Sequence, residues 1–297
     1  MAHFLAVSNR KGGVGKSTIA VMLAHAAASW SGLRVLVMDL DTQCSASLML
    51  IGGARWEKAC RSGHTISDYF YDRFDKVAED ESAYIVNNAG DVVRGRTAGV
   101  VSLLPGSQRL EDIQSELLLK HSKKDLEADA VAVQVRGRMK RLMKHFGIDF
   151  DLVILDCPPG LSYAALAALD LAHHVLVPFR PDFVSQFAVD RVAMLIERAE
   201  TAEQLASIPF ERRRYSCLAN CWTGNGHERL LIDELALDHP LLGIRIPLLA
   251  NIARGFDWDE TKKTIDEKYA DALPHLRELH HHIMGTLELR TQTARVQ

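Results

Sequence analysis

The segment NRKGGVGKST, residues 9–18, limits the possible folds of this chain more than any other part of its sequence. It follows an apolar run at residues 4–8 and leads into an Ala-rich stretch at 17–30, which predicts a strand, a glycine-rich loop and a helix in succession. Glycines let backbone N–H groups converge on phosphate oxygens, and the amino end of a helix favours negative charge. We therefore expect a phosphate-binding loop in which Lys16 reaches the terminal phosphates and the Ser17 hydroxyl binds Mg²⁺.

The remaining sequence predicts an α/β fold. Further apolar runs rich in Val, Leu and Ile lack polar–apolar alternation, as expected of strands that are covered on both faces. They lie at residues 34–40, 152–156, 174–179 and 215–220, and segments of helical period such as 183–200 lie between them. This alternation indicates a doubly wound, mainly parallel sheet with helices on both faces.

Residues 51–99 interrupt the alternation with many glycines and a group of aromatic side chains. The pattern predicts a short helix and a hairpin, inserted between the second and third core strands. A strand then resumes at 100–107 and ends at Pro105-Gly106. Because no long linker is visible, we expect one domain over residues 1–297, with this insertion and a helical tail at 274–297.

Composition narrows the class of protein. With 47% apolar residues, 25% charged residues and a net charge of −3, the sequence is typical of a globular domain and does not favour general coating of nucleic acid. The five cysteines form no CxxC pair and no signal peptide is visible, so we expect a reducing, cytoplasmic setting. No uncharged apolar run approaches the roughly 18 residues that span a bilayer.

The phosphate loop departs from the ordinary pattern G-x-x-x-x-G-K-[ST], because Arg10 stands at the first glycine and Lys11 follows it. The segment KGGVGKST resembles the deviant Walker A loop of the ParA/MinD family of ATPases, in which the extra lysine reaches the ATP of the partner in a nucleotide-sandwich dimer. The resemblance implies an ATP-dependent homodimer, with Lys11 and Lys16 catalytic. It implies that ATP is bound by Lys11, Gly12, Gly13, Val14, Gly15, Lys16, Ser17 and Thr18.

Charge explains what a second lysine contributes. A bound triphosphate carries about four negative charges, and Mg²⁺ together with Lys16 offsets about three of them. A lysine supplied by a partner would complete the balance, as an arginine finger does, and such fingers accelerate phosphoryl transfer by about 10³–10⁵. We therefore expect a slow ATPase (ATP and water to ADP and phosphate) that depends on dimerisation.

Two acidic motifs strengthen the resemblance. VLVMDLDTQCSAS, residues 35–47, resembles the family's D-x-D-P-Q motif with Thr42 in place of proline, which implies that Asp41 activates water and Asp39 supports Mg²⁺. DLVILDCPPGLS, residues 151–162, is similar to the family's Walker B strand, with Gly160 in place of serine. That match implies that Asp156 holds Mg²⁺ through water.

The later half of the chain resembles the family more weakly. HHVLVPFRPDFVSQFAVDRV, residues 173–192, is similar to the segment after Walker B, and CLANCW and GIRIPLLANIARG are similar to the closing strands. By this analogy Asn220 and Pro247 lie near the adenine.

Family members differ in what the dimer binds, and several outcomes stay open. One branch binds DNA non-specifically and moves plasmids, chromosomes or protein cargo over the nucleoid, with hydrolysis stimulated by a ParB-like or other adaptor. Another is a MinD-like membrane- or scaffold-associated positioning ATPase without DNA binding, but the tail lacks a lysine-rich face with bulky aromatics, which disfavours a membrane. We expect the DNA-binding branch and nucleoid association. The candidate DNA contacts are Arg212, Arg213, Arg214, Arg191 and Arg245.

Overall fold

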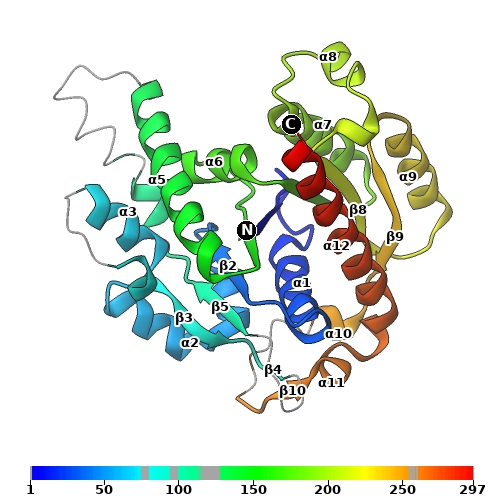
Figure 1. Cartoon of the computed structure of the whole chain (residues 1–297). Helices are drawn as coiled ribbons and strands as arrows, with labels where there is room; N and C mark the ends of the chain where they lie inside the picture. The colour runs from blue at the N-terminus through cyan, green and yellow to red at the C-terminus, as the bar shows by residue number, and fades with distance from the viewer. Residues whose placement is uncertain are drawn as a thin grey trace.

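The computed structural model describes residues 2–74, 80–93, 100–113, 115, 128–253, 258 and 260–296. In this part of the chain an eight-stranded sheet forms the centre of the molecule, in the order β3-β5-β2-β6-β1-β7-β8-β9 (Figure 1). Every neighbouring pair is parallel except β3 and β5. Its strands are β1 (His3–Val7), β2 (Val35–Asp39), β3 (Val86–Ala89), β5 (Val101–Leu104), β6 (Leu152–Asp156), β7 (His174–Phe179), β8 (Tyr215–Trp222) and β9 (Leu241–Pro247).

Helices cover both faces of this sheet, which confirms the doubly wound α/β prediction. The α-helices are α1 (Lys16–Trp30), α2 (Ser45–Arg61), α3 (Ile66–Phe74), α5 (Ala128–Asp149), α6 (Tyr163–Leu171), α7 (Phe183–Glu197), α8 (Ala202–Ala206), α9 (Gly226–Asp238), α10 (Ala250–Ala253), α11 (Ile265–Tyr269) and α12 (Leu273–Val296). Short 3₁₀ turns are η1 (Glu81–Tyr84), η2 (Phe210–Arg212) and η4 (Ala270–Ala272).

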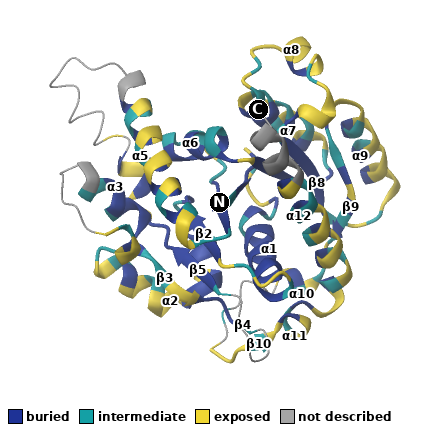
Figure 2. Cartoon of the chain, in the orientation of Figure 1, coloured by how far each residue is buried: buried dark blue, intermediate teal, exposed yellow. Residues whose placement is uncertain are grey.

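The strands form because their side chains are apolar on both faces. In β1, Phe4 and Ala6 belong to one core, which α3, α5, α6, α7 and α9 complete. Leu5 and Val7 belong to a second core, which α1, α2, α11 and α12 complete. Successive side chains of a strand point to opposite faces, so a strand between two layers of helices must be apolar throughout. Figure 2 shows the central strands and α1 buried beneath a more exposed outer layer.

The insertion at 51–99 contains the predicted short helix, α3, but not the predicted hairpin. Its first residues continue α2, which bends at Gly52, where φ is +69° and the Trp258 ring fills the space of a side chain. β3 does not pair with β4 as a hairpin; it joins the main sheet antiparallel to β5, and β4 (Val92–Val93) pairs with β10 (Lys263–Thr264). Residues 75–79 and 94–99 of the insertion lie outside the described residues.

The tail is helical, as predicted, and its apolar face is already covered. α12 packs along α1 (Figure 1), and four of its side chains, Leu276, Leu279, Ile283 and Leu287, are at most 1% exposed. Trp30 at the end of α1 contacts Arg277 and His280 of α12. The apolar stripe of the tail is therefore used in the core. Among the described residues, none of the helices is long and apolar enough to cross a bilayer.

Candidate nucleotide-binding site

The three phosphate motifs meet at the carboxyl edge of the central strands. β1, which leads into the glycine-rich loop, lies between β6 and β7, and β6 lies between β1 and β2. The register pairs Val7 with Asp156 and Asp156 with Asp39, so the ends of three strands are level with one another. The strand order changes direction at β1, because β6 lies on one side of it and β7 on the other, and ligands of open α/β sheets bind at such a switch point.

The loop at 9–16 has the conformation that only glycine adopts readily. Gly13 and Gly15 have φ of +71° and +85°. A side chain at Gly15 would also lie 2.3 Å from Asn220 Nδ2. That nitrogen donates a hydrogen bond to the Val14 carbonyl at 2.8 Å, so Asn220 holds the loop in place from β8. Gly12 and Gly13 are exposed, and α1 starts immediately after the loop.

Lys16 lies beneath this loop at 6% exposure, with Nζ 3.3 Å from the Lys11 carbonyl oxygen. Burial lowers its pKa, and the carboxylates of Asp156 and Asp41 partly offset that shift. A buried ammonium next to two carboxylates is placed to bind an anion at the amino end of α1. Ser17 and Thr18 occupy the first turn of that helix.

Asp156 is the best candidate for a metal site. Its carboxylate is fully buried and neither oxygen has a geometrically satisfactory hydrogen-bond partner in the described structure. Burial raises the pKa of Asp156 well above its usual range, and repulsion from Asp39 adds to the shift, while Ser17 and Lys16 only partly offset it. A buried carboxylate whose neighbours do not offset its desolvation is costly unless a cation or its bound water satisfies it. The residues therefore fit Mg²⁺, which Ser17 and Asp156 would hold.

Asp39 does not fit its expected role beside Mg²⁺. One of its oxygens accepts hydrogen bonds from the backbone N–H and the hydroxyl of Ser47, at 2.8 and 2.6 Å, and the other accepts from the N–H of Asp41 at 3.2 Å. Gly106 closes the remaining side, because a Cβ there would lie 2.9 Å from the carboxylate carbon. Asp39 thus fixes the start of α2 and the backbone of Asp41. Burial raises its pKa to about 6.

Asp41 is 6% exposed and lies beside a cavity of about 340 Å³. Gln43 N–H donates to one of its oxygens at 2.9 Å. The loops after β2 and β6 and the segment after β5 form the walls, which include Glu111, Pro158, Pro159 and Leu161. Space for an attacking water or a ligand is therefore present next to this carboxylate.

Lys11 has partners that the sequence did not predict. Its ammonium donates to Asp182 and, at 3.4 Å, to the Ser185 hydroxyl, both at the start of α7. Asn9 holds the Lys11 backbone N–H at 3.0 Å. Partial burial opposes ionisation of Asp182, but hydrogen bonds from Lys11 and Ser185 outweigh it and lower its pKa. Asp182 caps α7, a role that its spacing to Ser185 could have indicated. Its contact with Lys11 joins residues that are 171 positions apart, so no local pattern could have predicted it.

The predicted DNA contacts need correction. Arg213 is 2% exposed and donates to the carbonyls of Leu205, Ile208 and Asp238 and to the Tyr215 hydroxyl. Arg214 is half-buried, and its guanidinium donates to carbonyls at the end of α6, in the turn after it and in α7. Neither side chain can reach a phosphate while these bonds hold.

Three of the predicted basic side chains stay accessible. Arg212 and Arg191 are exposed, and Arg245 is half-buried over the ring of Trp222, 5.3 Å from its centre. Pro247 pairs in register with Trp222 at the ends of β9 and β8, on the same sheet edge as the phosphate loop. The proposed adenine contacts of Asn220 and Pro247 thus share that edge, but the hydrogen bond of Asn220 goes to the loop.

A glycine-rich loop after β1, Lys16 beneath it and Asp156 at the end of β6 define a P-loop nucleotide-binding domain with an additional lysine. The model of a family described as an AAA domain, AAA_31, matches residues 2–207. The chain therefore belongs to this family, and its relatives include a sporulation initiation inhibitor protein named Soj and a chromosome partitioning protein named ParA.

Two relatives and one solved structure illustrate the similarity. A putative replication protein A of Rhizobium rhizogenes is 32% identical over 189 residues, which are 63% of this chain and 42% of that protein. The sporulation initiation inhibitor protein Soj of Bacillus subtilis is 26% identical over 204 residues, 69% of this chain and 67% of Soj. The ATP complex of a variant of Cyanothece McdA has a TM-score of 0.69 at 17% identity and covers 96% of both chains, which supports the fold. The chain spans less than half the length of the Rhizobium relative.

Proposed function

We propose that this protein is a ParA-like ATPase that forms an ATP-sandwich dimer, binds DNA non-specifically in the ATP state, and partitions or positions a plasmid, chromosome or protein cargo. The observation that carries the proposal is the second lysine of the phosphate loop. Lys16 already occupies the buried position beneath the loop, while Lys11 is on its rim with a partly exposed side chain. A lysine at the rim can serve a nucleotide held by another molecule.

The site supports ATP hydrolysis through groups that are already arranged. Backbone N–H groups of residues 12–18 and the amino end of α1 would bind the phosphates, with Lys16 at the terminal ones. When bound, Mg²⁺ would neutralise phosphate charge next to Ser17 and Asp156. Asp41 would accept a hydrogen bond from the attacking water in the adjacent cavity, and Asp39 would hold the Asp41 backbone in that position.

Lys11 would make dimerisation and hydrolysis depend on ATP. Two loops that each carry Lys11 and Arg10 repel one another when no phosphate lies between them. With ATP in both sites, each Lys11 would leave Asp182 and contact the partner's phosphates. A cation supplied in this way contributes about 4–7 kcal/mol to lowering the barrier, so the monomer would hydrolyse ATP slowly.

DNA binding would follow from dimerisation. Arg212, Arg191 and Arg245 are single charges on a chain of net charge −3, and a monomer would bind phosphates weakly. A two-fold dimer doubles the number of these cations and fixes their spacing. The proposal places the protein in the cytoplasm on the nucleoid, with a ParB-like or other adaptor that stimulates hydrolysis.

The test is an electrophoretic shift of a non-specific DNA duplex with ATP or ADP, at about 50 and about 200 mM salt. We expect a shift with ATP and Mg²⁺ that weakens at the higher salt, because phosphate contacts release counterions. An Arg212→Ala/Arg191→Ala variant should weaken the shift and keep ATP turnover. Binding that ignores the nucleotide, or its absence, would favour the membrane- or scaffold-associated alternative.

A further inference from the structure

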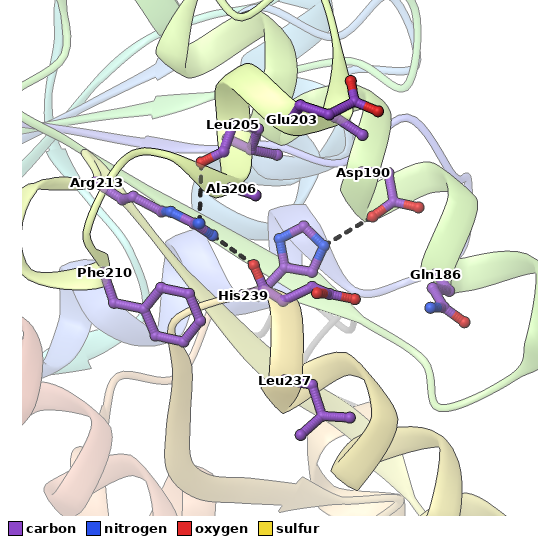
Figure 3. Close-up of a pocket in the computed structure, with 11 residues that line it drawn as sticks. Gln186, Asp190, Glu203, Leu205, Ala206, Phe210, Arg213, Leu237 and His239 are labelled. Atoms are coloured by element: carbon purple, nitrogen blue, oxygen red, sulfur yellow. Dashed lines mark hydrogen bonds and ion pairs between the residues drawn. The ribbon is translucent and has the colours of Figure 1, made fainter.

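A second cavity, of about 430 Å³, lies among α7, α8, η2 and the end of α9 (Figure 3). Its residues belong to the later half of the chain and include none of the phosphate motifs. The volume is within the range of about 300–1,000 Å³ that is usual for ligand pockets. None of the roles proposed above uses this cavity.

Its floor is fixed by a chain of hydrogen bonds. Arg213 donates to carbonyls on the α8, η2 and α9 sides and to the Tyr215 hydroxyl. Because an arginine can only donate, the Tyr215 oxygen accepts, and its proton is left for His239 Nδ1 at 2.8 Å. His239 Nε2 then donates to Asp190 of α7, also at 2.8 Å. This arrangement satisfies each group in the chain.

These bonds hold the walls of the cavity together and occupy the hydrogen-bond donors of Arg213 and His239 in its floor. Arg213 and His239 are 2% and 1% exposed, so a ligand would find them already engaged. The walls that Arg213 joins are separate elements of the chain, and they are held together before any ligand arrives. A preformed site costs little ordering on binding.

The rim of the cavity is negatively charged, whereas the Arg213 side chain in its floor is positively charged. Its accessible charged groups are the carboxylates of Asp190, Glu203 and Asp238, against the single buried guanidinium of Arg213. Glu203 accepts hydrogen bonds from its own N–H and from Thr201, which lower its pKa and keep it ionised. The rim therefore offers acceptors and negative charge.

The walls are apolar and partly open to solvent. Leu237 is 78% exposed and Phe210 is 38% exposed, and Leu205, Ala202 and Ala206 also line the cavity. In Figure 3, Phe210 and Leu237 lie on the left and lower sides of the cavity, and Glu203 and Asp190 on the upper and right sides. Exposed apolar side chains within a ring of carboxylates suit a ligand that is both apolar and cationic.

We propose that this groove, formed by α7, α8, η2 and the end of α9, docks a short segment of a partner protein that presents apolar side chains flanked by lysines or arginines. The apolar side chains would contact Leu237, Phe210 and Leu205, and the flanking cations would contact Glu203, Asp190 and Asp238. The residues that line the groove include none of the phosphate motifs, so this proposal stands apart from the dimer and its ATP.

The experiment selects phage-displayed random dodecapeptides against the nucleotide-free protein, with a Glu203→Lys/Asp238→Lys variant as counter-selection. Both positions are exposed, and a lysine at the end of α9 suits the helix dipole, so the variant should fold. We expect the enriched peptides to combine lysine or arginine with leucine or phenylalanine. In fluorescence anisotropy their Kd should rise about tenfold or more in the variant.

A Glu57→Lys/Asp149→Lys variant is the matched control, because it changes the net charge equally at exposed positions of α2 and α5. It should change Kd by less than about threefold, and Leu237→Ser should raise Kd by about three- to tenfold. Failure to enrich peptides, enrichment of acidic ones, or equal losses in the control would overturn the proposal. If the groove variant instead alters self-association of the protein in sedimentation, a second copy occupies the groove and the partner proposal fails.

Discussion

At the scale of single residues, the ion pair between Lys11 and Asp182 is the most informative contact of the molecule. It joins the phosphate loop to the first turn of α7, and both side chains are partly exposed, at 27% and 38%. An exposed pair of this kind is worth about 0–1 kcal/mol, so a phosphate could displace it. The contact therefore suits a lysine that changes partners.

Replacing Asp182 by asparagine should make dimerisation easier. Asparagine caps a helix as well as aspartate does, so α7 should remain intact while the charge that holds Lys11 is removed. We expect the ATP concentration for half-maximal dimerisation to fall by about two- to fivefold, which corresponds to at most about 1 kcal/mol. Light scattering against ATP concentration measures it, with Asp149→Asn as the control. An unchanged or higher ATP requirement would contradict the retaining role of Asp182.

The buried carboxylates predict how stability depends on pH. Burial raises the pKa of Asp156, and raises the pKa of Asp39 to about 6, so the folded chain binds protons more tightly than the unfolded chain does. Their ionisation thus destabilises the nucleotide-free protein above about pH 6, so these two carboxylates contribute stability as the pH falls through about 6. The buried His25 acts in the opposite direction, because burial lowers its pKa to about 3. The difference in Tm between the wild type and Asp156→Asn, measured without Mg²⁺ at about pH 7.5 and about pH 5.5, isolates the carboxylate contribution and should be larger at about pH 7.5.

The variant Asp156→Asn tests the same carboxylate directly. Because it removes a buried charge whose desolvation Ser17 and Lys16 only partly offset, it should raise Tm at about pH 7.5 by about 2–6 °C without Mg²⁺, at roughly 2–4 °C per kcal/mol. Mg²⁺ with ATP should then stabilise the variant less than the wild type. A lower Tm, or undiminished stabilisation by Mg²⁺, would remove Asp156 from the metal site. Asp149→Asn, at the exposed end of α5, is the control.

At the scale of elements, the sequence predicted those strands whose positions depend on the local pattern of apolar residues. The apolar runs placed β1, β2, β6, β7 and β8 to within about two residues, because strands between two layers of helices have few polar positions. The insertion was harder, because the pairing of β3 with β5 and of β4 with β10 depends on segments far apart in the chain. Short polar strands such as VNNA carry little pattern of their own.

The tail illustrates an element that packing defines. Leu279 of α12 is fully buried against the α1 side of the sheet, so Leu279→Ala should lower the free energy of unfolding by about 2–5 kcal/mol. His281→Ala, on the exposed side of α12, should change it by less than about 0.5 kcal/mol. Urea unfolding compares the two. Equal, small effects would mean that α12 is not part of the core and that its apolar face is available elsewhere.

At the scale of the whole molecule, the sequence predicted which motifs meet but not how their side chains are used. Lys16 and Asp156 lie together because their loops follow adjacent strands. The sequence did not predict that Asp39 accepts hydrogen bonds from Ser47, or that buried Arg213 donates hydrogen bonds to carbonyls near α8, η2 and α9. Such contacts depend on the final packing. A run of three arginines predicts charge, and burial decides whether that charge is available.

The most direct measurement is sedimentation velocity of the wild type and the Lys11→Ala variant, with ATP or ADP and Mg²⁺. We expect a wild-type dimer with ATP and a monomer with ADP. Lys11→Ala should remain monomeric with ATP while it still binds a fluorescent ATP analogue to within about threefold of the wild type, because Lys16 and the amino end of α1 are unchanged. A Lys11→Ala variant that dimerises with ATP as the wild type does would contradict the central claim.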